Sequence, residues 1–72
     1  MNVGDVVTFT CNGRGRGGHY SVRAIVTKVK PKTVDMTEAD RSYRPGTNWN
    51  IPKTWIETVN GIKYADYNKY ND

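Results

Sequence analysis

Arginine and lysine are the side chains of this chain best suited to chemistry with a partner, and they gather in its first half. Between positions 6 and 34 there are six basic residues and no acidic residue, whereas from position 35 onward there are five basic and six acidic residues. A stretch of one sign creates a positive field that attracts polyanions. The other interpretation is that the net charge of +4 serves solubility alone. The six residues are Arg14, Arg16, Arg23, Lys28, Lys30 and Lys32.

A glycine-rich segment carries the first two arginines. Four of the seven glycines fall within residues 12–18, and glycine this dense predicts a mobile loop. The Arg14-Gly15-Arg16 run is similar to the Arg-Gly repeats of RNA-binding tails, in which arginine contacts phosphate and stacks on bases. His19 and Tyr20 follow at the edge of the loop, and their rings could stack on a base.

Three alternating lysines lie at the end of the second predicted strand and in the turn after it. Lys28, Lys30 and Lys32 share one phase, which would form a stripe that follows a phosphate backbone. The same pattern is typical of an exposed strand that lysine protects against edge pairing. The two interpretations are compatible.

A second cationic group interleaves arginine with an aromatic ring. Arg41, Tyr43 and Arg44 lie in a predicted loop, and they suit stacking together with phosphate contact. Glu38 and Asp40 lie nearby and would weaken this contact by forming ion pairs.

Enzymatic and metal chemistry find little support. The single Cys11 cannot form an internal disulfide, and with one histidine it cannot build a zinc site alone. No nucleophile stands beside a base and no phosphate-binding glycine motif occurs. We therefore expect a non-enzyme without cofactor or metal.

Membrane insertion and export find no support either. No apolar run approaches the roughly 20 residues of a membrane span, and the first ten residues lack the apolar core of a signal peptide. We expect a cytoplasmic protein without a membrane partner.

Alternating hydrophobic residues predict an all-β domain. Seventy-two residues suffice for one small domain. The predicted antiparallel strands cover residues 5–11, 21–30, 33–38, 47–51 and 56–59, with a bulge near Thr27-Lys28 and a hairpin turn about Pro31. Residues 52–55 suit one 3-10 turn, and Asn60-Gly61 predicts a type I′ turn.

The strand phases also predict the core. Cys11 points inward with its strand, and at least one of Trp49 and Trp55 should be buried, because large aromatic rings dominate small cores. Tyr64, Tyr67 and Tyr70 are three apart, which would place them near one helical face. The predicted core comprises Val7, Phe9, Val26, Val34, Met36, Ile51 and Ile56.

Three segments together resemble the SH3-like barrel superfamily, of the kind seen in KOW, Tudor and Sm-type modules. They are residues 3–7, residues 24–29, and residues 49–56 with their Pro-x-x-Trp turn. The resemblance implies a small closed barrel of five to six short antiparallel strands with one 3-10 turn over residues 1–66, followed by a tail over residues 67–72. Such barrels mostly bind RNA, DNA or peptides, seldom catalyse, and are common in bacteria and phages; fold alone does not determine function.

Charge and resemblance together favour a small nucleic-acid-binding module. It would contact RNA or DNA phosphates through the basic Gly/Arg loop and the lysine-bearing hairpin, with little base readout. The alternative is a protein-interaction module, for example a phage accessory factor that acts on a host protein. In that alternative, Trp49, Trp55, Tyr20 and Tyr43 would be the contact residues.

Overall fold

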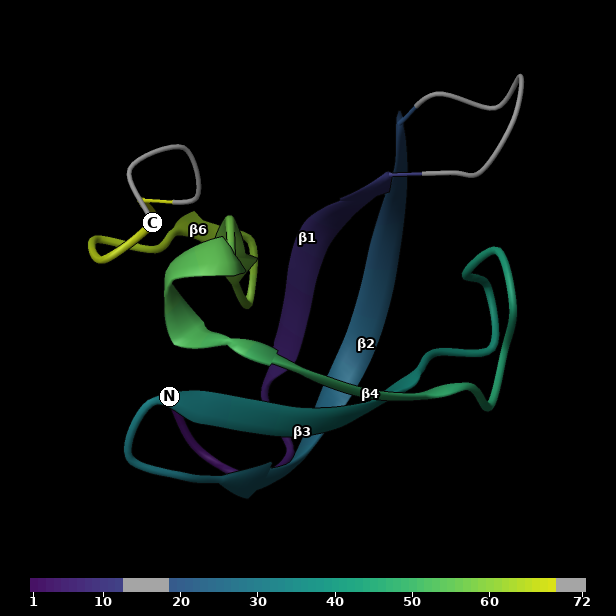
Figure 1. The fold of residues 1–72 in the computed structure, drawn as a ribbon. Helices are drawn as coiled ribbons and strands as arrows, with labels where there is room; N and C mark the ends of the chain where they lie inside the picture. Colours follow the sequence, from purple (N-terminus) through teal and green to yellow (C-terminus); the bar gives the residue numbers. More distant parts are fainter. Residues whose placement is uncertain (13–18, 69–72) are drawn as a thin grey trace.

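Six antiparallel strands form one sheet in the computed structural model, which describes residues 1–12 and 19–68. The spatial order of the strands is β4-β3-β2-β1-β5-β6, and Figure 1 shows β3 and β4 running across the direction of β1 and β2. In chain order the elements are β1 (Val6–Asn12), β2 (His19–Val29), β3 (Thr33–Glu38), β4 (Asn48–Pro52), the 3-10 turn η2 (Lys53–Trp55), β5 (Thr58–Val59) and β6 (Ile62–Lys63).

The long strand β2 belongs to both halves of the sheet. Its first part pairs with β1, from His19 opposite Asn12 to Ile25 opposite Val6, and its last part pairs with β3. The register with β3 shifts between Val26 and Lys28, which confirms the predicted bulge. A bulge increases the local twist, and this one lies where β2 passes from one half of the sheet to the other.

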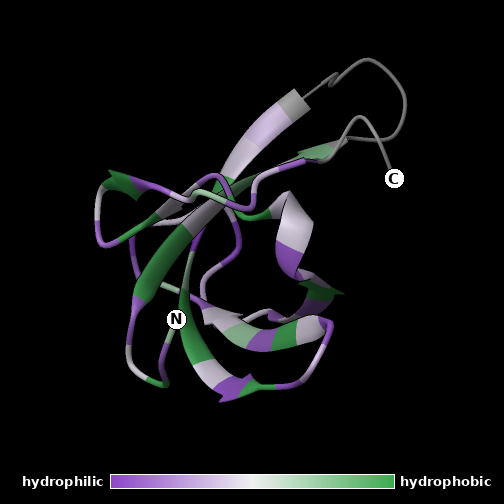
Figure 2. Cartoon of the chain, turned by 90° about the vertical axis from the view of Figure 1, so that its left-hand side faces the viewer, coloured by the Kyte–Doolittle hydropathy of each residue, from purple (hydrophilic) through white to green (hydrophobic). Residues whose placement is uncertain are grey.

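The core lies on one face of the bent sheet, and its side chains alternate with exposed ones along each strand. Figure 2 shows this alternation as bands of hydrophobic and hydrophilic residues. All seven predicted core residues are buried, and Val22 and Ala24 join them from β2. Ile25, in the opposite phase, is 43% exposed.

Neither tryptophan is fully buried, so that prediction is wrong. Trp49 and Trp55 are both half-buried and pack against the core from its edge. Trp49 lies on β4, at the edge of the sheet, and its indole N–H donates to the buried carboxylate of Glu38. Cys11, expected inside, is also half-buried and packs against the same cluster.

Within the described residues the sheet is open, and β4 and β6 form its edges. The all-β class, the antiparallel pairing and the 3-10 turn are confirmed, whereas the sheet is not closed into the expected barrel. The predicted strand over residues 56–59 shortens to Thr58–Val59, because the Ile56 N–H closes the η2 turn by donating to Lys53 O. The two residues of β5 pair with β1 on one side and with β6 on the other.

The Asn60-Gly61 hairpin forms as predicted. Both residues have positive φ, 52° and 83°, and they join β5 to β6. After β6 the chain makes a turn in which Tyr67 N–H donates to Tyr64 O, and Asn68 N–H then reaches Thr54 O at 2.8 Å. Tyr64 and Tyr67 therefore do not share a helix face, and Tyr70 lies outside the described residues.

Candidate nucleic-acid interface

Four lysines surround the turn between β2 and β3. Lys28 and Lys32 are exposed, and Lys30 lies between them in sequence. The fourth, Lys53, comes from η2 and is held at the turn by two hydrogen bonds: its backbone N–H donates to Lys32 O at 3.0 Å, and its Nζ donates to Pro31 O at 3.2 Å. We call Lys28, Lys30, Lys32 and Lys53 the lysine turn.

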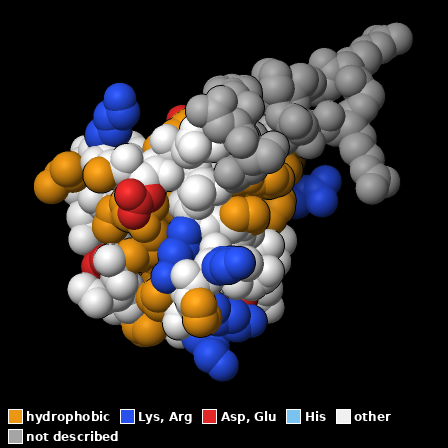
Figure 3. Space-filling model, turned by 60° about the vertical axis from the view of Figure 1, so that its left-hand side comes forward, with side chains coloured by type: hydrophobic (Ala, Val, Ile, Leu, Met, Phe, Trp, Pro, Cys, Tyr) orange, Lys and Arg blue, Asp and Glu red, His pale blue; other side chains and the backbone are white. Residues whose placement is uncertain are grey.

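Lysine and arginine side chains are visibly grouped on this side of the molecule. Figure 3 brings forward the left-hand side of Figure 1, where the β2–β3 turn and η2 lie, and shows cationic side chains beside hydrophobic ones. Positive charges gathered this closely reinforce one another's field.

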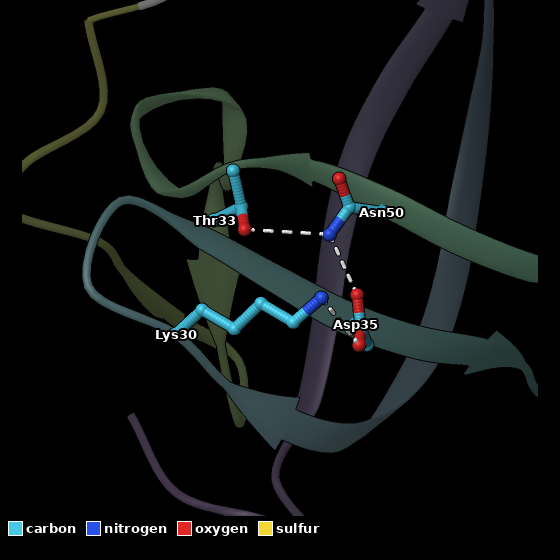
Figure 4. Close-up of polar contacts among 4 residues, drawn as sticks. All are labelled: Lys30, Thr33, Asp35 and Asn50. Carbon is cyan, nitrogen blue, oxygen red and sulfur yellow. Dashed lines mark hydrogen bonds and ion pairs between the residues drawn. The ribbon is translucent and has the colours of Figure 1, made fainter.

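One acidic residue, Asp35 on β3, contacts the lysine turn. Its Oδ2 lies 3.2 Å from Lys30 Nζ, and its Oδ1 accepts a 2.6 Å hydrogen bond from Asn50 Nδ2 on β4. Figure 4 shows Asn50 between Asp35 and Thr33, whose Oγ1 it also contacts at 3.3 Å. The Asn50 hydrogen bond, followed by that of Lys30, holds the pKa of Asp35 below its usual value.

The three lysines of the predicted stripe therefore differ in whether they form an ion pair. Lys30 is engaged with Asp35, whereas Lys28 and Lys32 extend from the surface. Lys28 also stands opposite Asp35 in the strand pairing. Four cations and one anion leave a net charge of about +3 on the turn.

A groove lies directly beside the lysine turn. It has a volume of about 980 Å³ and runs between the β2–β3 turn, η2 and the segment after β6. We call it the aromatic groove because three aromatic rings and two prolines line it. These residues are Trp55, Tyr64, Tyr67, Pro31 and Pro52, with Lys32, Lys53 and Asp66 as the charged members.

At the opposite end of β2, the rings of Tyr20 and Tyr43 pack together. Their centroids are 5.0 Å apart, and the Arg44 guanidinium carbon lies 5.7 Å from the centroid of Tyr43. A hydrogen bond with Cys11 raises the pKa of Tyr20. Tyr43 remains 67% exposed, so a planar group could stack on it. We call Tyr20, Tyr43 and Arg44 the tyrosine cluster.

The buried carboxylate of Glu38 holds the loop that carries this cluster. Glu38 is only 3% exposed, and it accepts hydrogen bonds of 2.8 Å from the backbone N–H of Arg44 and from Trp49 Nε1. Burial by itself would raise the pKa of Glu38, but these hydrogen bonds outweigh it and the pKa is lowered. Glu38 contacts Arg44 through the backbone N–H, and its negative charge also acts on the Arg44 guanidinium without an ion-pair contact.

The other predicted contact residues fall into two groups. Arg23 and Arg41 are exposed and line one shallow hollow together, at the base of the same loop. Arg14 and Arg16 lie outside the described residues, and so does the loop that is predicted to be mobile. The side chain of His19 is not described either.

Sequence reasoning missed the aromatic groove and the fourth lysine. Lys53 belongs to the Pro-x-x-Trp turn and has no predicted contact role, and Trp55 is predicted as a contact residue only in the protein-interaction alternative. Tyr64 falls at the end of the predicted domain and Tyr67 in the predicted tail, and neither has a predicted contact role. The signal that could have found the groove is the concentration of aromatic residues at positions 55, 64 and 67, which follow a turn rich in proline and lysine.

In the described part of the chain, no group of three or more His, Cys, Asp or Glu side chains is arranged to hold a metal ion. Among the same residues, no helix has the length and apolar character needed to cross a bilayer. Comparisons of the chain with protein-family models, curated proteins and solved structures found no match.

Proposed function

We propose that the protein is a small, non-enzymatic, cytoplasmic nucleic-acid-binding module with an SH3-like arrangement of strands. The strand order β4-β3-β2-β1-β5, with a 3-10 turn between β4 and β5, supports the SH3-like assignment. In this proposal the module contacts phosphates by charge and reads little sequence.

The observation that carries the proposal is the lysine turn. Lys53 is far from Lys28 and Lys32 in sequence, yet its hydrogen bond to Pro31 O brings it to the same turn. Several cations on one surface neutralise several phosphates of a single chain, and the release of counterions then drives binding. A single phosphate-containing metabolite would not need a surface of this extent.

The tyrosine cluster supplies a second contact in the same proposal. Arg44 would pair with a phosphate while the exposed face of Tyr43 stacks on a base. The Gly/Arg loop with Arg14 and Arg16 follows Asn12, which pairs with His19 at this same end of the sheet. We include both arginines in the proposed interface on the grounds of charge.

The test is a salt titration of oligonucleotide binding, followed by fluorescence anisotropy. The slope of log affinity against log salt should be steep, and it should fall by roughly 0.7–0.9 for each phosphate contact that is lost. Lys28→Ala, Lys32→Ala and Lys53→Ala should each reduce it by about that amount. Lys63→Ala, which removes an exposed lysine of β6, is the matched control. The absence of binding at about 50 mM salt would refute the proposal.

The alternative function is that of a protein-interaction module, and one observation favours it. Tyr43 and Ile62 are 67% and 73% exposed, and large apolar side chains exposed in this way are common in protein interfaces. A pull-down from lysate separates the two functions. Nuclease treatment should release the captured material if nucleic acid mediates it, whereas a direct protein partner should remain bound.

A further inference from the structure

We infer that the aromatic groove takes unpaired bases, so that the nucleic acid bound at the lysine turn is single-stranded. This inference rests on the proposed function, and it names the class of nucleic acid that the same site would take.

The groove and the lysine turn are parts of one surface. Lys32 and Lys53 belong to the lysine turn and also line the groove, and Pro31 and Pro52 lie next to them in sequence. A phosphate held by either lysine is therefore attached to a nucleotide whose base lies at the groove. Backbone charge beside aromatic faces is the arrangement that binds single strands without sequence preference.

The groove has the dimensions and lining for a planar, partly apolar group. Its volume of about 980 Å³ is at the upper end of the roughly 300–1,000 Å³ of small-molecule sites. Trp55 and Tyr64 pack against the core on one side, and both are only half-buried, as is Tyr67. In a duplex the bases are stacked inside, and entry into such a groove requires that they leave the stack.

The negative charge of Asp66 indicates how a strand would lie. Asp66 is the one acidic side chain among the described residues that line the groove, and it hydrogen-bonds to Tyr64. It would repel phosphates on the Tyr64 side, while Lys32 and Lys53 attract them on the opposite side. The backbone would therefore follow the lysines, and the bases would point toward the tyrosines.

The test compares three probes of the same length, about twelve nucleotides, at about 50 mM salt. They are a single strand, its duplex, and an abasic strand that carries the phosphates without the bases. The single strand should bind at least about fivefold more tightly than the abasic strand, since stacking of one base contributes at least that factor. It should also bind more tightly than the duplex.

Two variants separate base contact from phosphate contact. Tyr67→Ala should reduce the preference for the single strand over the abasic strand and leave the salt slope unchanged. Lys32→Ala should lower the salt slope and keep that preference. Thermal unfolding of both variants checks the fold, and the comparison of probes on the unmodified protein stands even if a variant fails to fold.

Each result decides between the two proposals. Equal affinity for the single strand and the abasic strand, or equal affinity for the duplex, would overturn the inference and leave the proposed function standing. No binding of any probe would overturn the proposed function itself. Tighter binding of poly-glutamate than of the single strand at a matched number of charges would identify the groove as a site for acidic peptides, and would also overturn the inference.

Discussion

The indole Nε1 of Trp49 donates a 2.8 Å hydrogen bond to the buried carboxylate of Glu38. The same indole packs against the ring of Phe9 in a T-shaped pair, with centroids 5.3 Å apart and planes at 76°. One side chain thus joins the core to a polar anchor. Because Glu38 also accepts from the Arg44 backbone, the anchor connects β3 and β4 with the loop that presents the tyrosine cluster.

Removal of this anchor should destabilise the protein. Glu38→Ala leaves the Trp49 and Arg44 N–H groups without their acceptor, and the loss of hydrogen bonds to a charged group costs about 1.5–3 kcal/mol. We expect the free energy of unfolding in urea to fall by about 2–3 kcal/mol. Asp40→Ala removes an exposed acid two positions away and should change it by less than about 0.5 kcal/mol. Equal losses in the two variants would contradict this role of Glu38.

Acid should destabilise the protein through the same group. The pKa of Glu38 is lowered from 4.5 on folding, so its contribution to stability is complete above about pH 4.5 and is lost as the pH falls through the folded-state pKa. Asp35, with a pKa lowered from 3.8, should act in the same direction. Urea unfolding between about pH 7 and pH 3 measures this. The loss should be smaller in Glu38→Gln, and an identical pH profile in that variant would argue against Glu38 as a source.

Adjacent residues of β2 should differ sharply in their tolerance of substitution. Val26 is 1% exposed and Ile25 is 43% exposed. Val26→Ala leaves a cavity and should cost about 1–3 kcal/mol, whereas Ile25→Ala should cost less than about 0.5 kcal/mol. Thermal or urea unfolding gives both values, and a reversed order would mean that the face of β2 has been misassigned.

The Asn60-Gly61 turn should depend on backbone conformation and on one side chain. A Cβ at Gly61 meets nothing within 4 Å, so Gly61→Ala should cost roughly 1–2 kcal/mol through its positive φ alone. Asn60→Gly keeps the turn but removes the acceptor of the Val6 N–H and the donor to Asp5 Oδ1. It should lower the free energy of unfolding by roughly 0.5–1.5 kcal/mol. A stabilising effect of Gly61→Ala would contradict the type I′ geometry.

Neutralisation of Asp35 should strengthen oligonucleotide binding. Asp35→Asn releases Lys30 from its 3.2 Å ion pair and raises the charge of the lysine turn by one. We expect the affinity at about 50 mM salt to rise about two- to fivefold. Adding Lys30→Ala to Asp35→Asn should abolish the gain, and a gain that survives in the double variant would show that Lys30 is not the cation released.

Local patterns determined much of the fold. The alternation of Val7 and Phe9 with Thr8 is sufficient to assign the faces of β1, because successive side chains of a strand point to opposite sides. The phase slip after Val26 located the bulge, and Asn60-Gly61 located the last hairpin, because few residues accept the positive φ of a type I′ turn. The strand faces, the bulge and the hairpin turn each depend on residues that are adjacent in the chain, so the sequence is sufficient to predict them.

Tertiary structure alone decided the polar contacts and the assembly of the candidate site. The strand phase of Glu38 places it with Val34 and Met36, yet its burial depends on donors from Arg44 and Trp49 that no local pattern supplies. Lys53 reaches the lysine turn through a hydrogen bond to Pro31, 22 positions earlier. Whether the sheet closes depends on how its two edge strands, β4 and β6, lie relative to each other. Such contacts join residues far apart in the chain, and composition and periodicity carry no information on which distant groups will meet.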